Sequence, residues 1–205
     1  MRTSRSIAVA ALTTALGVTL GACGTGESPD TEPTSNATDS TADSSPSPTG
    51  PAVPEGWKVA SAEVAQLHVP PDWELESHAD QAQTMVAPEN KNGLSPGSGE
   101  VMAGAYGADG ETEESVEGLA KLLNDQLKAD SSLTKLERLP DETINGTLFY
   151  HFRAETDFDW QDHYGTVTPT TRDQVTVTWK FNKSDIDRKG AKALIDPIMA
   201  TYEAR

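Results

Sequence analysis

The aromatic residues of this 205-residue chain are confined to one region, and this confinement decides where a core can form. All 12 Trp, Tyr and Phe residues lie between Trp57 and Tyr202. Residues 24–54 instead contain 6 Ser, 6 Thr, 6 Pro and 3 Gly, and Val53 is their only apolar residue larger than Ala. Such a segment buries too little apolar surface to offset the entropy of ordering it. We therefore expect residues 23–54 to form a disordered tether and residues 55–205 to form one folded domain.

Charge and cysteine content narrow the classes of partner. The chain has a formal net charge of −16, and residues 55–205 contain 14 basic and 27 acidic residues, which gives −13 for the domain. Nucleic acids and anionic membrane surfaces repel a strongly acidic domain, so we expect no nucleic-acid partner. The single Cys excludes an intramolecular disulfide and any zinc site built on several cysteines.

The first 23 residues have the layout of a bacterial export signal. Arg2 and Arg5 precede an apolar stretch, residues 7–20, which is shorter than the ~20 residues that a membrane-spanning helix needs. The stretch ends in Leu20-Gly21-Ala22-Cys23, which resembles a bacterial lipobox. The resemblance implies that residues 1–22 are a lipoprotein signal peptide that is removed before Cys23. It also implies an S-diacylglycerol group on the Cys23 thiol and an acyl chain on its amino group.

Membrane lipid is therefore the expected partner of Cys23. Two or three acyl chains anchor a protein stably, whereas one chain exchanges. We expect the protein at the cell membrane, lipid-anchored on the extracytoplasmic face. The alternative is an ordinary secretory signal that happens to contain a cysteine.

Hydrophobic periodicity within residues 55–205 predicts a mixed α and β domain. The predicted strands cover residues 64–69, 73–77, 84–87, 101–106, 133–139, 148–155, 164–168 and 174–181. Asn145-Gly146 predicts a type I′ hairpin. One helix is predicted from a Thr112 cap to Asp130, and a second after a Ser184 cap, with Pro197 kinking or restarting it. This order of elements predicts an α+β fold, an antiparallel β-sheet flanked by helices.

One stretch of the predicted domain carries a family resemblance. Val69-Pro70-Pro71-Asp72-Trp73 closes a strand, and a mid-chain helix, an Asn-Gly hairpin and a C-terminal Ile-Met-Ala-Thr-Tyr helix follow. This layout resembles the PsbP-like α/β/α sandwich, and more narrowly the LpqN-type lipoproteins of actinobacteria. The resemblance implies an exported, lipid-anchored domain that binds proteins or ligands, and it supplies no catalytic residues.

Asp157, Asp159, Asp162 and His163 form the densest group of possible hard-metal ligands. Their spacing resembles the start of a calcium-binding loop but lacks the turn glycine and the distal bidentate Glu. We therefore expect a solvated acidic loop here. Calcium binding by Asp157, Asp159 and Asp162 is the alternative.

Other patterns supply no catalytic constellation. Gly93, Ser95 and Gly97 match Gly-x-Ser-x-Gly, but Pro96 follows the serine and has no N–H to donate to an oxyanion hole. The histidines lack metal-ligand spacing, and we expect structural or surface roles for all four: His68, His78, His151 and His163. We expect no catalytic residue and no cofactor.

Together these observations predict an exported, lipid-anchored lipoprotein with a non-catalytic domain that binds a protein or a cell-envelope ligand. One alternative is an envelope enzyme whose site is assembled from scattered acids and histidines. The other is a calcium-responsive surface domain.

Overall fold

The computed structural model describes residues 52–78, 81–104, 115–169 and 171–205. The predicted signal peptide, residues 1–22, lies outside these ranges, and so does the tether up to residue 51. The lipobox residues Leu20, Gly21 and Ala22 and the lipidation residue Cys23 lie outside them as well.

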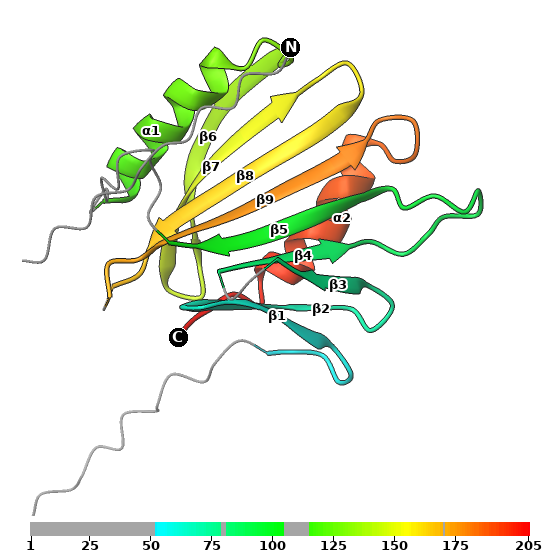
Figure 1. The fold of residues 1–205 in the computed structure, drawn as a ribbon, viewed down its shortest axis with the longest axis horizontal. Coiled ribbons are helices and arrows are strands. Elements are labelled where there is room, and N and C mark those ends of the chain that lie inside the picture. Colours follow the sequence, from blue (N-terminus) through cyan, green and yellow to red (C-terminus); the bar gives the residue numbers. More distant parts are fainter. Residues whose placement is uncertain (1–51, 79–80, 105–114, 170) are drawn as a thin grey trace, which may run out of the picture. The chain divides into compact units, whose positions relative to one another are not determined.

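A seven-stranded antiparallel sheet organises the described part of the chain, in the order β3-β4-β5-β9-β8-β7-β6 (Figure 1). Its strands are β3 (Glu74–Ser77), β4 (Ala82–Val86), β5 (Gly97–Ala103), β6 (Lys135–Ile144), β7 (Thr147–Glu155), β8 (Asp159–Val167) and β9 (Gln174–Asn182). A smaller sheet has the order β1-β2-β10 and consists of β1 (Lys58–Ala62), β2 (Ala65–Val69) and β10 (Glu203–Ala204).

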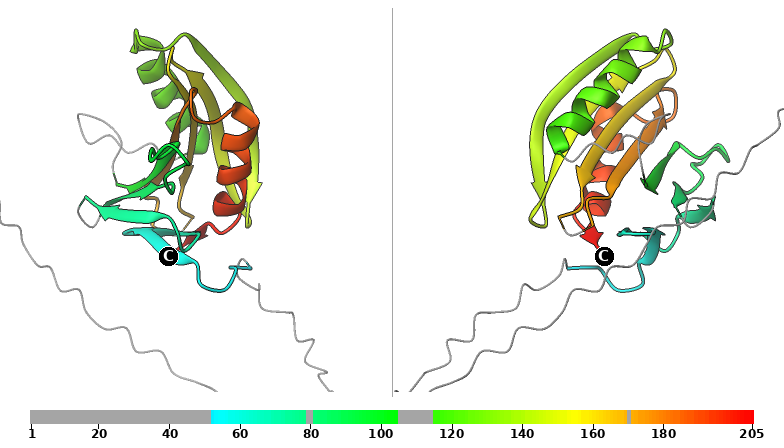
Figure 2. Two further views of the ribbon diagram at one scale, coloured as in Figure 1. Left: turned by 90° about the vertical axis from the view of Figure 1, so that its right-hand side faces the viewer. Right: turned by 60° about the vertical axis from the view of Figure 1, so that its left-hand side comes forward.

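The two described helices, α1 (Val116–Ala129) and α2 (Arg188–Met199), lie on opposite faces of the large sheet (Figure 2). Side chains alternate between faces along a strand, so Phe149 and Tyr150 of β7 point in opposite directions. Phe149 belongs to the large apolar cluster that contains the buried face of α2, and Tyr150 packs with α1. The predicted α+β fold, an antiparallel sheet flanked by helices, is confirmed. Neither helix is long and apolar enough to cross a bilayer.

Both helices begin at a different cap from the one predicted. Helix α1 is capped by Ser115, whose hydroxyl accepts from the Gly118 N–H at 3.0 Å, so the Thr112 cap is wrong. Helix α2 is capped by Asp187, whose carboxylate accepts from the Gly190 N–H at 2.7 Å, so Ser184 is wrong as well. In both cases the capping oxygen satisfies the N–H of the third helical residue, which would otherwise lack an acceptor.

Pro197 lies in the last turn of α2, and the helix continues through it to Met199. A restart at Pro197 is therefore wrong. The predicted Asn145-Gly146 hairpin is confirmed, because both residues have positive φ angles, 48° and 79°, as a type I′ turn requires.

The segment predicted as a solvated acidic loop is mostly a strand. Strand β8 begins at Asp159 and is paired along its length, with β7 on one side and β9 on the other. Backbone pairing on both sides outweighs the polar composition of the segment, and Asp162 is buried with 6% of its surface exposed. Two further strands, β1 and β10, were not predicted, and β5 starts at Gly97, four residues before the predicted strand at 101–106.

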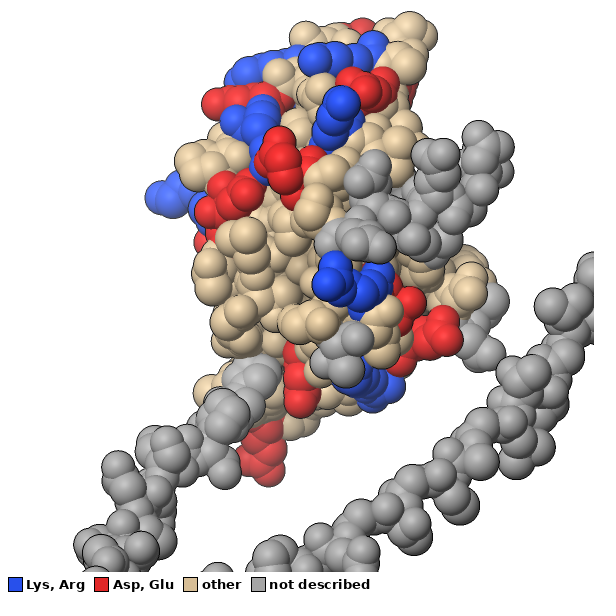
Figure 3. Space-filling model, turned by 90° about the vertical axis from the view of Figure 1, so that its left-hand side faces the viewer, with Lys and Arg blue, Asp and Glu red and all other residues tan. Residues whose placement is uncertain are grey.

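Acidic and basic side chains are intermixed over the side of the domain where α1 and β6 lie (Figure 3). Arg138 lies 3.7 Å from a Glu117 carboxylate oxygen, and Lys135 lies 3.9 Å from one of Glu137. The negative net charge is therefore not gathered into one acidic patch on this side.

Glycines of β5 allow large aromatic rings to lie directly across the sheet. Gly99 is paired with Trp179, and a Cβ added to Gly99 would lie 2.3 Å from that indole ring. Because Gly99 has no side chain, the Trp179 ring can lie over β5. There it contacts Trp73 edge-to-face, with 6.0 Å between ring centroids. Both indoles are buried in the main core.

We expect Gly99→Ala to lower the free energy of unfolding by about 1–3 kcal/mol, because a rigid buried ring must shift to admit one methyl group. Urea unfolding measures the change. The neighbouring Ser98→Ala is the matched control and should change stability by less than about 0.5 kcal/mol. Equal stability of the two variants would contradict the packing described for Trp179.

Candidate functional site

The candidate site is a group of charged side chains between the large sheet and α2. Strand alternation puts His151, Arg153 and Glu155 on the α2 face of β7, together with Phe149. The β7–β8 register places Asp162 directly opposite Arg153. Helix α2 begins beside these strands and adds Arg188 from its first turn.

Asp162 lies at the centre of this group. Its two carboxylate oxygens accept from His151 Nε2 at 2.9 Å and from Arg188 Nη1 at 2.8 Å. Arg153 Nε lies 3.7 Å from the oxygen that binds His151. Three positively chargeable groups thus surround one buried carboxylate and link β7, β8 and α2.

His151 is held between two carboxylates. Its Nδ1 lies 2.9 Å from Glu142 Oε1, and its Nε2 lies 2.9 Å from Asp162 Oδ1. Both nitrogens can donate together only in the imidazolium form, so the arrangement suits a positively charged ring. One face of the ring stacks on Tyr164, with 4.1 Å between centroids. His151 is buried with 2% of its surface exposed, so a surface position is wrong for this residue.

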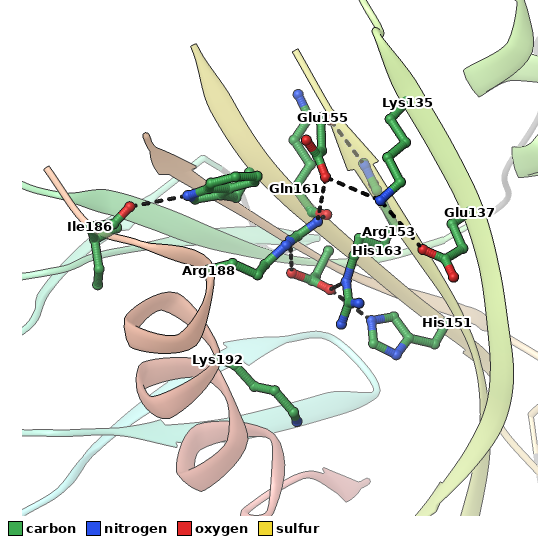
Figure 4. Close-up of polar contacts among 12 residues, drawn as sticks. Lys135, Glu137, His151, Arg153, Glu155, Gln161, His163, Ile186, Arg188 and Lys192 are labelled. Atoms are coloured by element: carbon green, nitrogen blue, oxygen red, sulfur yellow. Dashed lines mark hydrogen bonds and ion pairs between the residues drawn. The ribbon is translucent and has the colours of Figure 1, made fainter. Parts of the chain in front are cut away.

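Glu155 forms the second centre of negative charge. Its carboxylate lies 3.3 Å from Lys183 Nζ, 3.6 Å from Lys135 Nζ and 3.9 Å from Arg188 Nη2. Arg188 therefore bridges Glu155 and Asp162. Figure 4 shows its ion pair with Glu155. Burial lowers the pKa of the Arg188 guanidinium, and the charge of Asp162 opposes this effect.

Trp160 covers the outer side of the network. Its indole N–H donates to the Ile186 carbonyl at 3.1 Å. Lys183 Nζ lies 4.4 Å and Arg188 Cζ lies 5.0 Å from the ring centroid, within the range of cation–π attraction. The ring thus shields the ion pairs of Glu155 from water on one side, and the sheet shields them on the other.

The network is well suited to hold charges in place and poorly suited to transfer protons. A general base needs a free nitrogen or oxygen within reach of a substrate proton. Both nitrogens of His151 are engaged by carboxylates, and both oxygens of Asp162 are engaged by cations. Burying such charges is costly unless they are paired, and here each is paired.

A pocket of about 360 Å³ adjoins the network. It lies between the β6–β7 hairpin and the last two turns of α2. Glu142 and Asp196 supply carboxylates to its wall, Tyr164 supplies a phenol, and Ile144 and Met199 supply apolar surface. Glu142 and Tyr164 both contact His151, so the pocket and the network share a wall.

The predicted metal ligands are not brought together. Asp157 is exposed at the β7–β8 turn. Asp159 and Asp162 are three positions apart on β8, so they point to opposite faces of the sheet. Asp159 lies 3.3 Å from Lys180 Nζ, and Asp162 belongs to the network. Over the described residues, no cluster of three or more His, Cys, Asp or Glu side chains has a geometry that could hold a metal ion.

Ser95 of the Gly-x-Ser-x-Gly match is engaged locally. Its hydroxyl donates to the Gly97 carbonyl at 2.9 Å. Gly97 begins strand β5, whereas the residue at this place in a nucleophile elbow lies in the turn into a helix.

Sequence reasoning did not identify Glu142, Glu155 or Arg188 as members of a site. The alternation of Phe149, His151 and Glu155 was the available signal, since polar residues on the face of a buried Phe need partners. The sequence alone could not name those partners, because Arg188 is 26 positions from Asp162.

Neither a protein-family model nor a curated protein matches this chain. Solved structures with a similar fold include a protein of Bacteroides thetaiotaomicron. It matches 71% of this chain, with 13% sequence identity and a TM-score of 0.41. The chain spans 47% of that protein's length. The Saccharomyces cerevisiae Ran-binding protein Mog1p matches over 72% of this chain and 94% of its own, with 12% identity and a TM-score of 0.46. A variant of Mog1 matches over 72% and 95%, with 12% identity and a TM-score of 0.45. Likeness at this level carries no inference about ligand or activity.

A second buried histidine, His163 on β8, supplies a pH-dependent contribution to stability. His163 is 8% exposed, and burial lowers its pKa to about 4, with partial opposition from the charge of Asp162. Its Nε2 lies 3.1 Å from Gln161 Oε1, and its Nδ1 lies 3.4 Å from the Thr178 hydroxyl, which suits a neutral ring. The unfolded chain, with a pKa near 6.5, takes up this proton at a higher pH than the folded protein does.

We therefore expect His163 to reduce stability as the pH falls from 6.5 toward 4, because only the unfolded chain is protonated in that window. Below about pH 4 the folded protein is protonated at His163 as well, so this group causes no further loss of stability. Between pH 7 and pH 4.5, wild type should lose about 2–3 kcal/mol more unfolding free energy than His163→Gln. Urea unfolding at both pH values measures this difference. Parallel pH dependences of the two proteins would contradict the buried neutral histidine.

Proposed function

We propose that this protein is an exported lipoprotein, anchored by acylated Cys23 to the extracytoplasmic face of the cell membrane. Its domain binds a protein or a cell-envelope ligand without catalysing a reaction. The sequence Leu20-Gly21-Ala22-Cys23, after a basic and then an apolar segment, supports the anchor. The tether of residues 23–54 would hold the domain away from the membrane.

The observation that favours binding over catalysis is the double engagement of His151. A histidine with carboxylates on both nitrogens orients its neighbours and has no free nitrogen to accept a substrate proton. The His151 ring fixes Glu142 by an ion pair and Tyr164 by stacking, and these two residues form one wall of the pocket. The network therefore supplies a rigid support for a binding surface.

The finer fold assignment belongs to the same proposal. Placement of α1 and α2 on opposite faces of an antiparallel sheet supports a PsbP-like α/β/α sandwich of the LpqN type. The small sheet β1-β2-β10 packs into the α2 side of this arrangement, since Leu67 and Val69 share the core that contains Ile195.

Replacement of the lipidation residue tests the proposal. We expect Cys23→Ala to abolish lipid attachment and signal processing, because the thiol that receives the diacylglyceryl group is gone. The variant should remain at the mass of the unprocessed chain and carry no acyl chain, as mass spectrometry of the protein from expressing bacteria measures.

Thr25→Ala is the control, since it changes a residue outside the lipobox and should be processed and acylated like wild type. A Cys23→Ala chain that is still cleaved and acylated would contradict the lipoprotein assignment.

A further inference from the structure

The pocket beside the network has a negatively charged wall. Glu142 and Asp196 both line it, and their side chains are 44% and 50% exposed, so neither is sealed from a ligand. One ammonium group already lies against this wall. Lys192 Nζ is 2.6 Å and 2.7 Å from the two carboxylate oxygens of Asp196. The wall therefore accommodates an ammonium group at hydrogen-bond distance.

Tyr164 adds a second and independent feature. Its side chain lines the pocket although only 3% of the residue is exposed. The hydrogen bonds found among the described residues do not engage its hydroxyl, so a molecule in the pocket can bond to it. Burial raises the pKa of this phenol, and the charges of Asp162, Glu142 and Asp196 raise it further. The hydroxyl is thus neutral and can accept a hydrogen bond from a ligand N–H.

The rest of the wall suits a short hydrocarbon chain. Ile144 and Met199 supply apolar contacts next to the carboxylates. An anionic ligand would be repelled by Glu142 and Asp196, and a neutral alcohol would gain nothing from their charge. A divalent cation needs six or more oxygen ligands or waters, whereas Glu142 and Asp196 are the two carboxylates that line the pocket, and no metal-binding cluster is found among the described residues.

We propose that this pocket binds an alkylammonium group, with Asp196 and Glu142 facing the charge and the Tyr164 hydroxyl accepting an N–H. The inference rests on the proposed ligand-binding role of the domain and names its ligand class. In the free protein, Lys192 occupies the Asp196 carboxylate and competes with the ligand. The ammonium group belongs either to a small free amine or to a lysine side chain of a protein partner.

The test uses the full chain in detergent and three probes of equal size, n-butylammonium, butan-1-ol and butyrate. Isothermal titration calorimetry should detect binding of n-butylammonium alone. A blocked Ala-Lys-Ala tripeptide forms the second arm. Tighter binding of the tripeptide than of n-butylammonium assigns the ligand to a protein partner, and the reverse assigns it to a free amine. Equal responses to n-butylammonium and butan-1-ol would overturn the inference.

Two variants report on the geometry. Lys192→Met removes the internal competitor and should bind n-butylammonium at least about twofold more tightly. Tyr164→Phe removes only the hydroxyl and should bind it about fivefold more weakly.

Lys189→Met is the matched control, because it removes the same charge from α2 at an exposed position outside the pocket. Affinities of Lys192→Met and Lys189→Met that both equal wild type would overturn the inference. Near-ultraviolet circular dichroism checks that each variant is folded. A negative result in these binding experiments would not contradict the proposed lipid anchor, because Cys23→Ala tests the anchor separately.

Discussion

The buried carboxylate of Asp162 is the constraint on which the α2 side of this domain depends. A buried carboxylate without partners is too costly to keep, so every element around Asp162 must present a donor or a cation to it. Strand β7 presents His151 and Arg153, and α2 presents Arg188. Moving any of these elements by one residue would leave a charge buried and unpaired. The network therefore fixes the register of the strands and the position of the helix together.

The pocket follows from the same arrangement. Glu142 pairs with one nitrogen of His151 and Tyr164 stacks on its ring, so both are positioned by the network before any ligand arrives. On the other face of the sheet α1 packs on Tyr150 and Phe152 with an ordinary apolar interface. The two faces thus differ, since the α2 face adds charge pairs and an open pocket to its apolar core, whereas α1 packs mainly by hydrophobic contact. Preorganised walls of this sort reduce the cost of ordering side chains when a ligand binds.

Strands with one apolar face were predictable, because alternation in β9 from Val175 to Phe181 is a local signal. The helix caps were wrong because several capping residues lie close together, and only the hydrogen bond to the third helical N–H selects Ser115 or Asp187. The acidic segment of β8 was misassigned for a different reason. Its partners β7 and β9 are the neighbouring strands of the chain, but the polar composition of the segment does not reveal this pairing. The cation Arg188 lies 26 positions from Asp162, so no local pattern could reveal it.

A double-mutant cycle on Asp162→Asn and Arg188→Met tests most directly whether these side chains act as one internal network. If they do, the double variant should be more stable than the sum of the single losses predicts, with a coupling free energy of about 1.5 kcal/mol or more in urea unfolding. The exposed pair of Lys192 and Asp196 on the same helix is the reference and should give no more than about 0.5 kcal/mol. If the stability losses of Asp162→Asn and Arg188→Met simply add in the double variant, as expected for the reference pair, the account is contradicted.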